Sequence, residues 1–259
     1  MVRALLIRGM LVGIVAGLLT FGFGKVFGEP PVDRAISFET ALDEAKAKAE
    51  AAKGMPVEEE PELVSREVQA GLGLFTGVMV YSIAFGGLFA LVFAVADRRI
   101  AGLGPRAVSA LLAGMGFVAV YVVPNLKYPA NPPSVGQHET IGYRTALYFI
   151  MMALSVAAMV GAAMLRKRLA ARHDGWTAAL VAGGVYIVAM AVVQRLLPGI
   201  NEVPDEFPAV VLWQFRIASL GMQLVMWATI GLLFGAVTER AHAASYGMAA
   251  ASRLKPALR

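Results

Sequence analysis

Seven polar side chains in two short segments have the chemistry of ligands for a divalent metal ion. One imidazole is combined with carboxylates and carboxamides. Such a set suits a borderline ion such as cobalt, nickel or zinc better than copper(I), which prefers thiolates and thioethers. The candidate ligands are His138, Glu139, Asn125 and Asn131 in the first segment and Glu202, Asp205 and Glu206 in the second.

The same two segments are rich in proline. The first carries Pro124, Pro129, Pro132 and Pro133, and residues 197–208 have a similar composition. Proline fixes φ and removes a backbone donor, so these segments must run extended, with carbonyls and amides available to water, a partner or an ion. We therefore expect two stiff caps rather than simple connections.

Arg144 and Arg216 each follow one of these caps. Arg144 lies 20 residues after Pro124, and Arg216 lies 18 residues after Pro198. A basic residue at a helix start opposes the helix dipole, so we expect an acidic partner from Glu139, Glu202, Asp205 or Glu206 and a supporting structural role for both arginines. The similar spacing also indicates a parallel repeat of helical hairpins.

The elements that carry these caps are predicted to be membrane helices. Of the 259 residues, 58% are hydrophobic and 16% charged, with a mean hydropathy of +0.66. Runs of about 20 apolar residues can cross the hydrocarbon of a bilayer as helices. We expect an all-α, polytopic bundle of six transmembrane helices, at Ala4–Gly24, Leu72–Ala96, Arg106–Val123, Thr145–Leu165, Thr177–Leu196 and Ile217–Val237. Glycine pairs four residues apart, such as Gly9 with Gly13, predict close helix packing.

Charge asymmetry predicts the orientation. One side of the six spans sums to +10 and the other to −5, so the basic side is expected in the cytoplasm, with both termini inside. The chain is then a single integral-membrane domain over residues 1–259, with an acidic extracytoplasmic insertion at 29–68 and a short cytoplasmic tail at 238–259. Within the insertion we expect a solvated helix from Ser37, as its N-cap, to Lys53. The length of the first run favours a retained span over a cleaved signal peptide.

Several classes of protein are disfavoured. The absence of cysteine excludes thiolate metal sites. No Asp, Glu, Lys or His lies in the middle third of a predicted span, which argues against a self-contained proton antiporter. The three histidines lie in loops or the tail, which argues against a bis-histidine haem. No nucleophile and base stand at a plausible spacing, so we expect no enzymatic activity, no permanently bound cofactor and no nucleic-acid partner.

Three strings resemble the CbtA family of predicted cobalt transporter subunits. They are residues 126–133 (LKYPANPP), residues 141–148 (IGYRTALY), and Phe207-Pro208 followed by residues 212–216 (LWQFR). The resemblance covers nearly the whole chain. It implies a multi-pass protein of the bacterial inner membrane that takes up cobalt for cobalamin synthesis, often beside a small one-span partner, CbtB, that supplies histidines. This chain has Gln137 where the family pattern has an acidic residue.

The resulting hypothesis is an integral-membrane subunit of a cobalt uptake system, with the bilayer, the cobalt ion and a CbtB-like protein as partners. Two alternatives stay open. One is a transporter of another divalent cation, such as nickel or magnesium. The other is a non-transporting membrane scaffold that docks a partner protein through its stiff caps.

Overall fold

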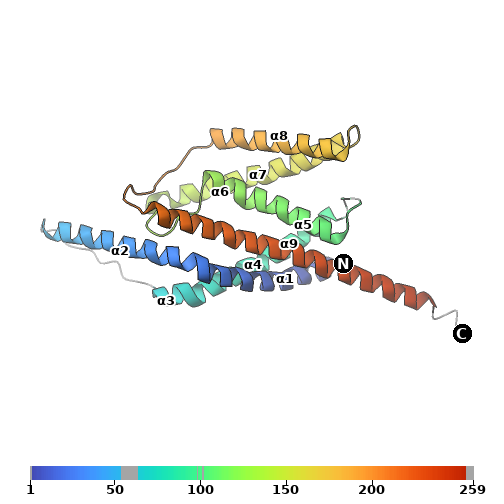
Figure 1. Ribbon diagram of the computed structural model, residues 1–259, viewed down its shortest axis with the longest axis horizontal. Coiled ribbons are helices and arrows are strands. Elements are labelled where there is room, and N and C mark those ends of the chain that lie inside the picture. The colour runs from blue at the N-terminus through green and yellow to red at the C-terminus, as the bar shows by residue number, and fades with distance from the viewer. Residues whose placement is uncertain (1, 54–63, 98, 101, 255–259) are drawn as a thin grey trace. The chain divides into compact units, whose positions relative to one another are not determined.

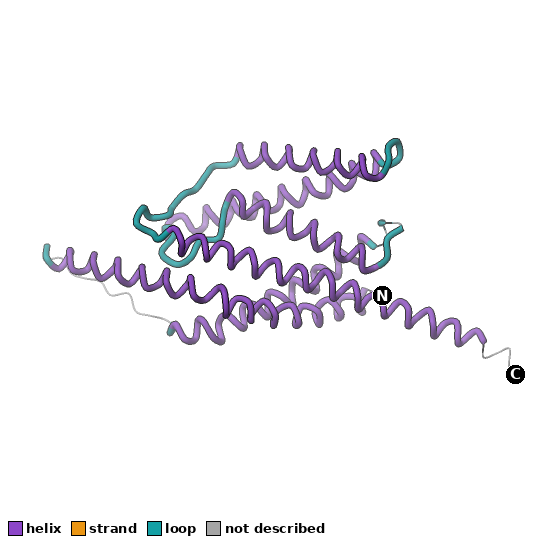
Figure 2. The backbone as a smooth tube through the Cα atoms, in the orientation of Figure 1, coloured by secondary structure: helices purple, strands orange, loops and turns teal. Residues whose placement is uncertain are grey.

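The computed structural model describes residues 2–53, 64–97, 99–100 and 102–254. Glu58, Glu59 and Glu60 of the predicted acidic insertion, and the last five residues of the predicted tail, lie outside these ranges. The described residues form helices joined by turns and loops, with no strand among them (Figures 1 and 2). The predicted all-α class is confirmed.

The helices follow one another from α1 to α9, with three π-helical segments (η1, η2 and η3) and one 3₁₀ turn (η4). Their bounds are α1 Val2–Phe23, η1 Gly24–Gly28, α2 Glu29–Ala51, α3 Arg66–Val68, η2 Gln69–Gly73, α4 Leu74–Ala96, α5 Pro105–Gly116, η3 Phe117–Val122, α6 Val123–Lys127, η4 His138–Thr140, α7 Ile141–Leu169, α8 Gly175–Leu196 and α9 Ala209–Leu254.

Six helical stretches are long and apolar enough to cross a membrane. They are Val2–Ala51, Arg66–Ala96, Pro105–Lys127, His138–Leu169, Gly175–Leu196 and Ala209–Ala244. Each contains one of the six predicted spans, so the number of spans is confirmed. Large apolar side chains along them are exposed, for example Leu180, Val188 and Leu196 on α8, as expected of surfaces that face lipid.

The chain forms two compact units. Unit 1 contains residues 1–23, 65–114 and 222–259, and unit 2 contains residues 24–64 and 115–221. Long helices run from one unit into the other, because the chain passes between the units within α5 and within α9.

Glycines of α1 pack directly on α4 in unit 1. A Cβ added to Gly9 would overlap the carbonyl of Gly86, and one added to Gly13 would lie 2.8 Å from the Cα of Ile83. Such close backbone approach is the usual role of small residues four apart in membrane helices. Gly77 has no atom within 4 Å of an added Cβ, so the same spacing on α4 does not mark a contact there.

The second half of α9 packs on α5 and α4 in the same unit. The Ser109 hydroxyl donates to the Gly231 carbonyl at 2.6 Å. The Phe234 ring makes edge contacts with Phe89 and Phe93, with ring centroids 5.5 and 5.1 Å apart. At the end of this contact, Arg106 of α5 forms an ion pair with Glu239 of α9.

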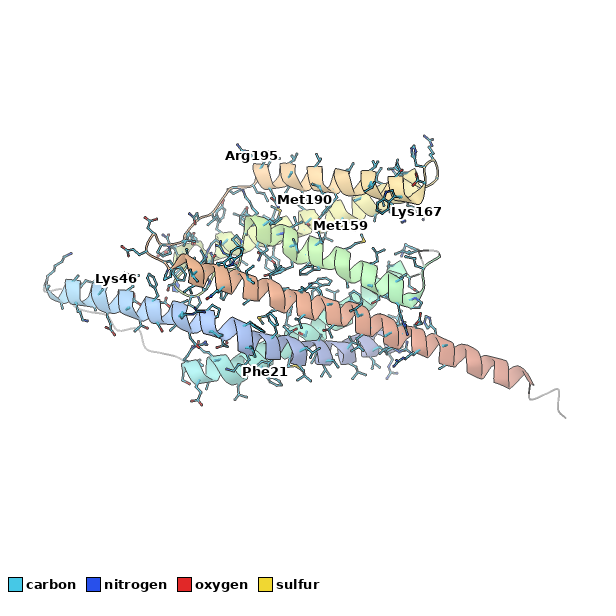
Figure 3. The ribbon with its side chains drawn as sticks, in the orientation of Figure 1. Phe21, Lys46, Met159, Lys167, Met190 and Arg195 are labelled. Atoms are coloured by element: carbon cyan, nitrogen blue, oxygen red, sulfur yellow. The ribbon has the colours of Figure 1, made fainter. Side chains whose placement is uncertain are left out.

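The α7–α8 hairpin is the main packing element of unit 2. Met151, Ala182, Tyr186 and Met190 belong to its buried cluster, and Met159 packs against that cluster (Figure 3). Inside it, the Ser155 and Tyr186 hydroxyls hydrogen-bond at 2.8 Å. This pairing satisfies two polar groups that would be costly to leave unbonded in an apolar interior.

One predicted helix boundary is wrong. Helix α2 does not start at Ser37 but at Glu29, where it continues from α1 through η1, and the Ser37 hydroxyl donates to the Asp33 carbonyl at 2.9 Å instead of capping a helix. Polar residues after an apolar run do not end a helix when they are themselves good helix formers. Helix α9 also continues to Leu254, so the residues predicted as a tail, 238–259, begin as a helix.

The contact of α1 with α4 predicts an effect of Gly13→Ala on stability. Because the added methyl group would meet the α4 backbone, the helices must move apart, at a cost of about 1–3 kcal/mol. Thermal unfolding in detergent should therefore occur at a lower temperature than in the unaltered protein. Gly22→Ala is the matched control, since no atom lies within 4 Å of its added Cβ. Equal stability of the two variants would contradict the packing described.

Candidate functional site

The loop parts of the two proline-rich segments, residues 128–140 and 197–208, meet in unit 2. From here on we call these two loops together the cap, and Pro124 and Asn125 belong to the preceding helix α6. Tyr128 of the first segment donates its phenolic hydrogen to the Pro198 carbonyl of the second, at 2.8 Å. Most of both segments is loop (Figure 2), with few backbone hydrogen bonds of its own. Side chains from the flanking helices therefore have to hold the cap in place.

Arg144, near the start of α7, holds the first segment to the second. Its Nε lies 3.4 Å from a carboxylate oxygen of Glu202, and its Nη2 donates to the Gln137 carbonyl at 3.3 Å. The same Glu202 oxygen accepts a hydrogen bond from the Gln137 amide at 2.9 Å. Gly136, with φ of +119°, leaves the space that the guanidinium occupies, because an added Cβ would overlap it.

Arg216, in the second turn of α9, reaches in the opposite direction. It follows the second segment in sequence but binds the first, donating to the Ala130 carbonyl at 3.3 Å and to the Asn131 side-chain oxygen at 2.9 Å. Each arginine thus follows one proline-rich segment and contacts the other. We call this arrangement the reciprocal arginine brace.

The Glu202 carboxylate is stabilised in its ionised form. Hydrogen bonds from the Thr140 side chain and the Gln137 amide, with a smaller contribution from the Arg144 charge, hold the pKa of Glu202 below its usual value of 4.5. Only 12% of its side-chain surface is exposed. Glu202 is therefore a charged group with defined partners rather than a freely solvated loop carboxylate.

Helix α2 supports the cap from one side. Ala35 is buried with Val135 and Phe207, one residue from each proline-rich segment. The Phe38 ring makes an edge contact with Phe207 at 5.2 Å, and the Ser134 hydroxyl donates to the Ala35 carbonyl at 3.3 Å. The start of the acidic insertion is thus packed structure and not a solvated linker.

Glu39 is a further carboxylate near the cap that the sequence analysis did not single out. It follows Ala35 by one helical turn, so it lies on the α2 face that packs against the cap. Its side chain is half-buried, and the charges of Asp43, Lys46 and His138 act on its carboxylate, that of His138 most weakly. The available signal was the apolar spacing of Ala35 and Phe38, which marks this face as buried even though the helix as a whole is polar.

The candidate ligands fall into two groups. Asn131 and Glu202 already accept hydrogen bonds within the brace. The other candidates have side-chain surface open to solvent. Asn125 on α6 is half-buried, and the exposed residues are His138, Glu139, Asp205 and Glu206. In the part of the chain that the structure describes, no three His, Asp or Glu side chains lie close enough to hold a metal ion together.

Four buried polar groups within the helices have no hydrogen-bond partner among the described residues: the hydroxyls of Thr20, Ser82 and Thr238 and the indole N–H of Trp227. Others are hydrogen-bonded. In unit 2 the Gln194 amide donates to the Val123 carbonyl at 3.3 Å, and the Tyr121 and Ser219 hydroxyls lie 2.8 Å apart. Hydrogen bonds between helices therefore account for the Gln194, Tyr121 and Ser219 side chains.

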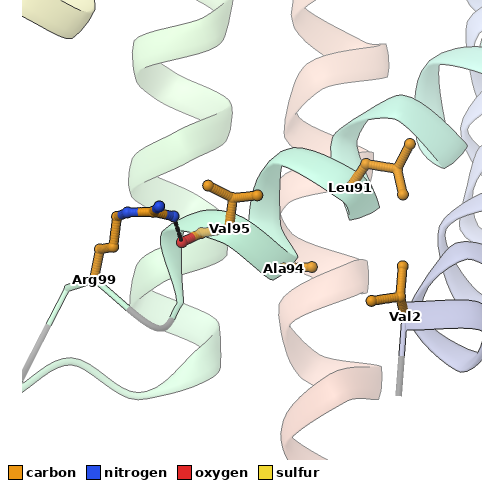
Figure 4. A pocket seen from close by; sticks show the side chains of 5 residues that line it. All are labelled: Val2, Leu91, Ala94, Val95 and Arg99. Atoms are coloured by element: carbon orange, nitrogen blue, oxygen red, sulfur yellow. Dashed lines mark hydrogen bonds between the residues drawn. The ribbon is translucent and has the colours of Figure 1, made fainter.

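A cavity of about 480 Å³ lies in unit 1, and none of the candidate ligands lines it (Figure 4). It is lined by Val2, Leu91, Ala94, Val95 and Arg99. The Arg99 guanidinium donates to the Val95 carbonyl at 2.9 Å. Aliphatic walls and a fixed positive charge do not suit a metal cation, so this cavity is not a candidate for the ion.

Comparisons with known proteins identify one family. The family model described as "Probable cobalt transporter subunit (CbtA)" matches residues 2–239 of the chain, which include both proline-rich segments, the first five spans and most of the sixth. No curated protein and no solved structure matches the chain.

The lowered pKa of Glu202 predicts a pH-dependent contribution to stability. The contribution is fully present above pH 4.5, the carboxyl's ordinary pKa, and is lost as the pH falls through the lower folded-state pKa. Glu202→Gln should therefore lower the thermal unfolding temperature at neutral pH, and the difference from the unaltered protein should shrink below pH 4.5. Unfolding in detergent, followed across this pH range, tests it; a difference that is independent of pH would contradict the ion-paired state.

Proposed function

We propose a mode of ion handling for this chain, which belongs to the CbtA family of probable cobalt transporter subunits. It is a multi-pass membrane protein and a subunit of a cobalt uptake system. The single observation that carries the function is the family match over residues 2–239. We further infer that the chain lies in a bacterial inner membrane with both termini in the cytoplasm, and that the cobalt feeds cobalamin synthesis.

Cobalt would first be bound at the accessible part of the cap. His138 would supply an imidazole, and either Glu139 or Glu39 would supply a carboxylate. Because no three such side chains lie close enough together in the described residues, water or the partner subunit would supply the remaining donors. This combination of nitrogen and oxygen donors suits Co²⁺. Asp205 and Glu206 on the second segment, and Asn125 on α6, are the further donors that the ion would meet.

Glu202 and Asn131 would act differently, because both already have partners. Glu202 is ion-paired with Arg144 and accepts a hydrogen bond from the Gln137 amide, and Asn131 accepts a hydrogen bond from Arg216. A cation that uses either oxygen must compete with a guanidinium of the same charge sign. Binding there would weaken the reciprocal arginine brace and loosen one proline-rich segment from the other. Arg144 and Arg216 are thus structural supports whose release accompanies ion entry.

The family description calls the chain a subunit, which implies a partner in the complex. We propose a small one-span, histidine-bearing protein of the CbtB kind. Its imidazoles would complement a cap that contributes one histidine to a carboxylate-rich set. The chain itself would have no enzymatic activity and no permanently bound cofactor, since transport of an ion between ligand sets needs neither.

Removal of the His138 and Glu39 donors should impair cobalt uptake. We expect His138→Ala combined with Glu39→Gln to lower the initial rate at sub-saturating cobalt by roughly tenfold, the scale of losing ligand interactions at a metal site. The measurement is uptake of radiolabelled cobalt into cells without their own importers. Glu44→Gln, an exposed α2 carboxylate paired with Lys48, is the control and should be silent. Unchanged uptake in the double variant, at equal membrane levels, would refute this site.

Competition of other metal ions with labelled cobalt for uptake distinguishes a cobalt transporter from a nickel or magnesium transporter and from a non-transporting scaffold. A cobalt system should be inhibited by excess unlabelled cobalt far more than by magnesium, because magnesium prefers oxygen ligands and should not depend on His138. Strong magnesium inhibition together with a silent His138→Ala variant would indicate a magnesium transporter, and stronger inhibition by nickel a nickel transporter. Co-purification of a partner without flux of any ion would indicate the scaffold.

A further inference from the structure

The turn between α7 and α8 carries a dense group of positive charges. Arg166, Lys167 and Arg168 end α7, and Arg172 lies in the following turn. All four are exposed, and one carboxylate, Asp174, follows them before α8 begins. We call these four residues the basic turn; together with Asp174 the segment has a formal charge of +3.

Asp174 has another partner. Its carboxylate accepts a hydrogen bond from the Thr177 amide at 2.9 Å and so caps α8. Those bonds hold the pKa of Asp174 below its usual value, so the Asp174 carboxylate is ionised. Within the described part of the chain, none of the four basic residues forms an ion pair with a carboxylate. The charge of the basic turn is therefore available to an external anion.

The residues around the basic turn indicate that it lies at a membrane surface, where an external anion would be a lipid headgroup. Successive helical residues turn by about 100°, so residues 166–168 spread their charges around most of the end of α7. Immediately next to them the helices expose large apolar side chains, Met164 on α7 and Leu180 on α8. Trp176, in the first turn of α8, is 74% exposed. An exposed tryptophan between lipid-facing aliphatic residues and basic residues is typical of the headgroup level of a bilayer.

We propose that the basic turn binds the headgroups of anionic phospholipids, such as phosphatidylglycerol, with Trp176 at the headgroup level. Arginine suits a phosphate because its guanidinium can donate two parallel hydrogen bonds. Anionic lipids attract basic segments beside transmembrane helices in this way. The opposite end of α8 has a single basic residue, Arg195 (Figure 3), and provides the comparison.

Trp176 can report on the lipid next to it. The chain has three tryptophans. The variant Trp213→Phe with Trp227→Phe keeps both rings aromatic and leaves Trp176 as the single indole. In nanodiscs of the full chain, we expect brominated phosphatidylglycerol to quench the fluorescence of Trp176 more than brominated phosphatidylcholine does at equal mole fraction. At low salt, the preference should be about fivefold for each cation that faces a headgroup.

Replacement of all four basic-turn residues by glutamine should abolish the preference, whereas Arg195→Gln should keep it. If the fourfold variant does not fold, a salt series on the protein with the basic turn intact is the second test, because the preference must fall as salt screens the charges. Equal quenching by the two lipids, or a preference that salt leaves unchanged, would overturn the proposal. Loss of the preference in millimolar inorganic phosphate at constant ionic strength would show a site for free phosphate, and capture of an acidic protein without lipid preference would show a protein-docking surface.

Discussion

The reciprocal arginine brace is the interaction on which the cap depends. Proline-rich loops cannot form a regular hydrogen-bond pattern, so other groups must fix their position. Arg144 and Arg216 do this by donating to carbonyls and to acceptor side chains of the first segment, and Arg144 also pairs with Glu202 of the second. The two arginines stand at similar spacings after their proline-rich segments, and the parallel repeat of hairpins that this spacing indicates stays a prediction.

The brace also constrains how a metal ion can be handled. A carboxylate or amide that already accepts from a guanidinium is a poor first ligand, because the ion must displace a charge of its own sign. The accessible donors, with His138 and Glu39 among them, are therefore suited to capture, and Glu202 and Asn131 are suited to a later step in which the cap changes. In the proposed mechanism helix α2 would contribute to both steps, since it carries Glu39 and packs on both proline-rich segments.

The membrane part of the fold was predictable because hydrocarbon leaves few choices. An apolar run of about 20 residues has to form a helix in which the backbone bonds to itself, so six runs give six spans. The identity of side-chain partners was not predictable in this way. Four carboxylates were equal candidates for Arg144, and only tertiary packing selects Glu202. The packing role of α2 was missed because its buried face consists of a few residues, including Ala35 and Phe38, in an otherwise polar helix. The π-helical segments were missed as well, because no recognisable sequence pattern marks them.

The most direct test of the account is the uptake of radiolabelled cobalt into cells that lack their own cobalt importers. The chain should be expressed alone and beside a one-span, histidine-bearing partner, with its folded state in the membrane verified in both cases. The account predicts cobalt accumulation above background when both proteins are present. No accumulation under either condition, with the folded proteins present in the membrane, would contradict it.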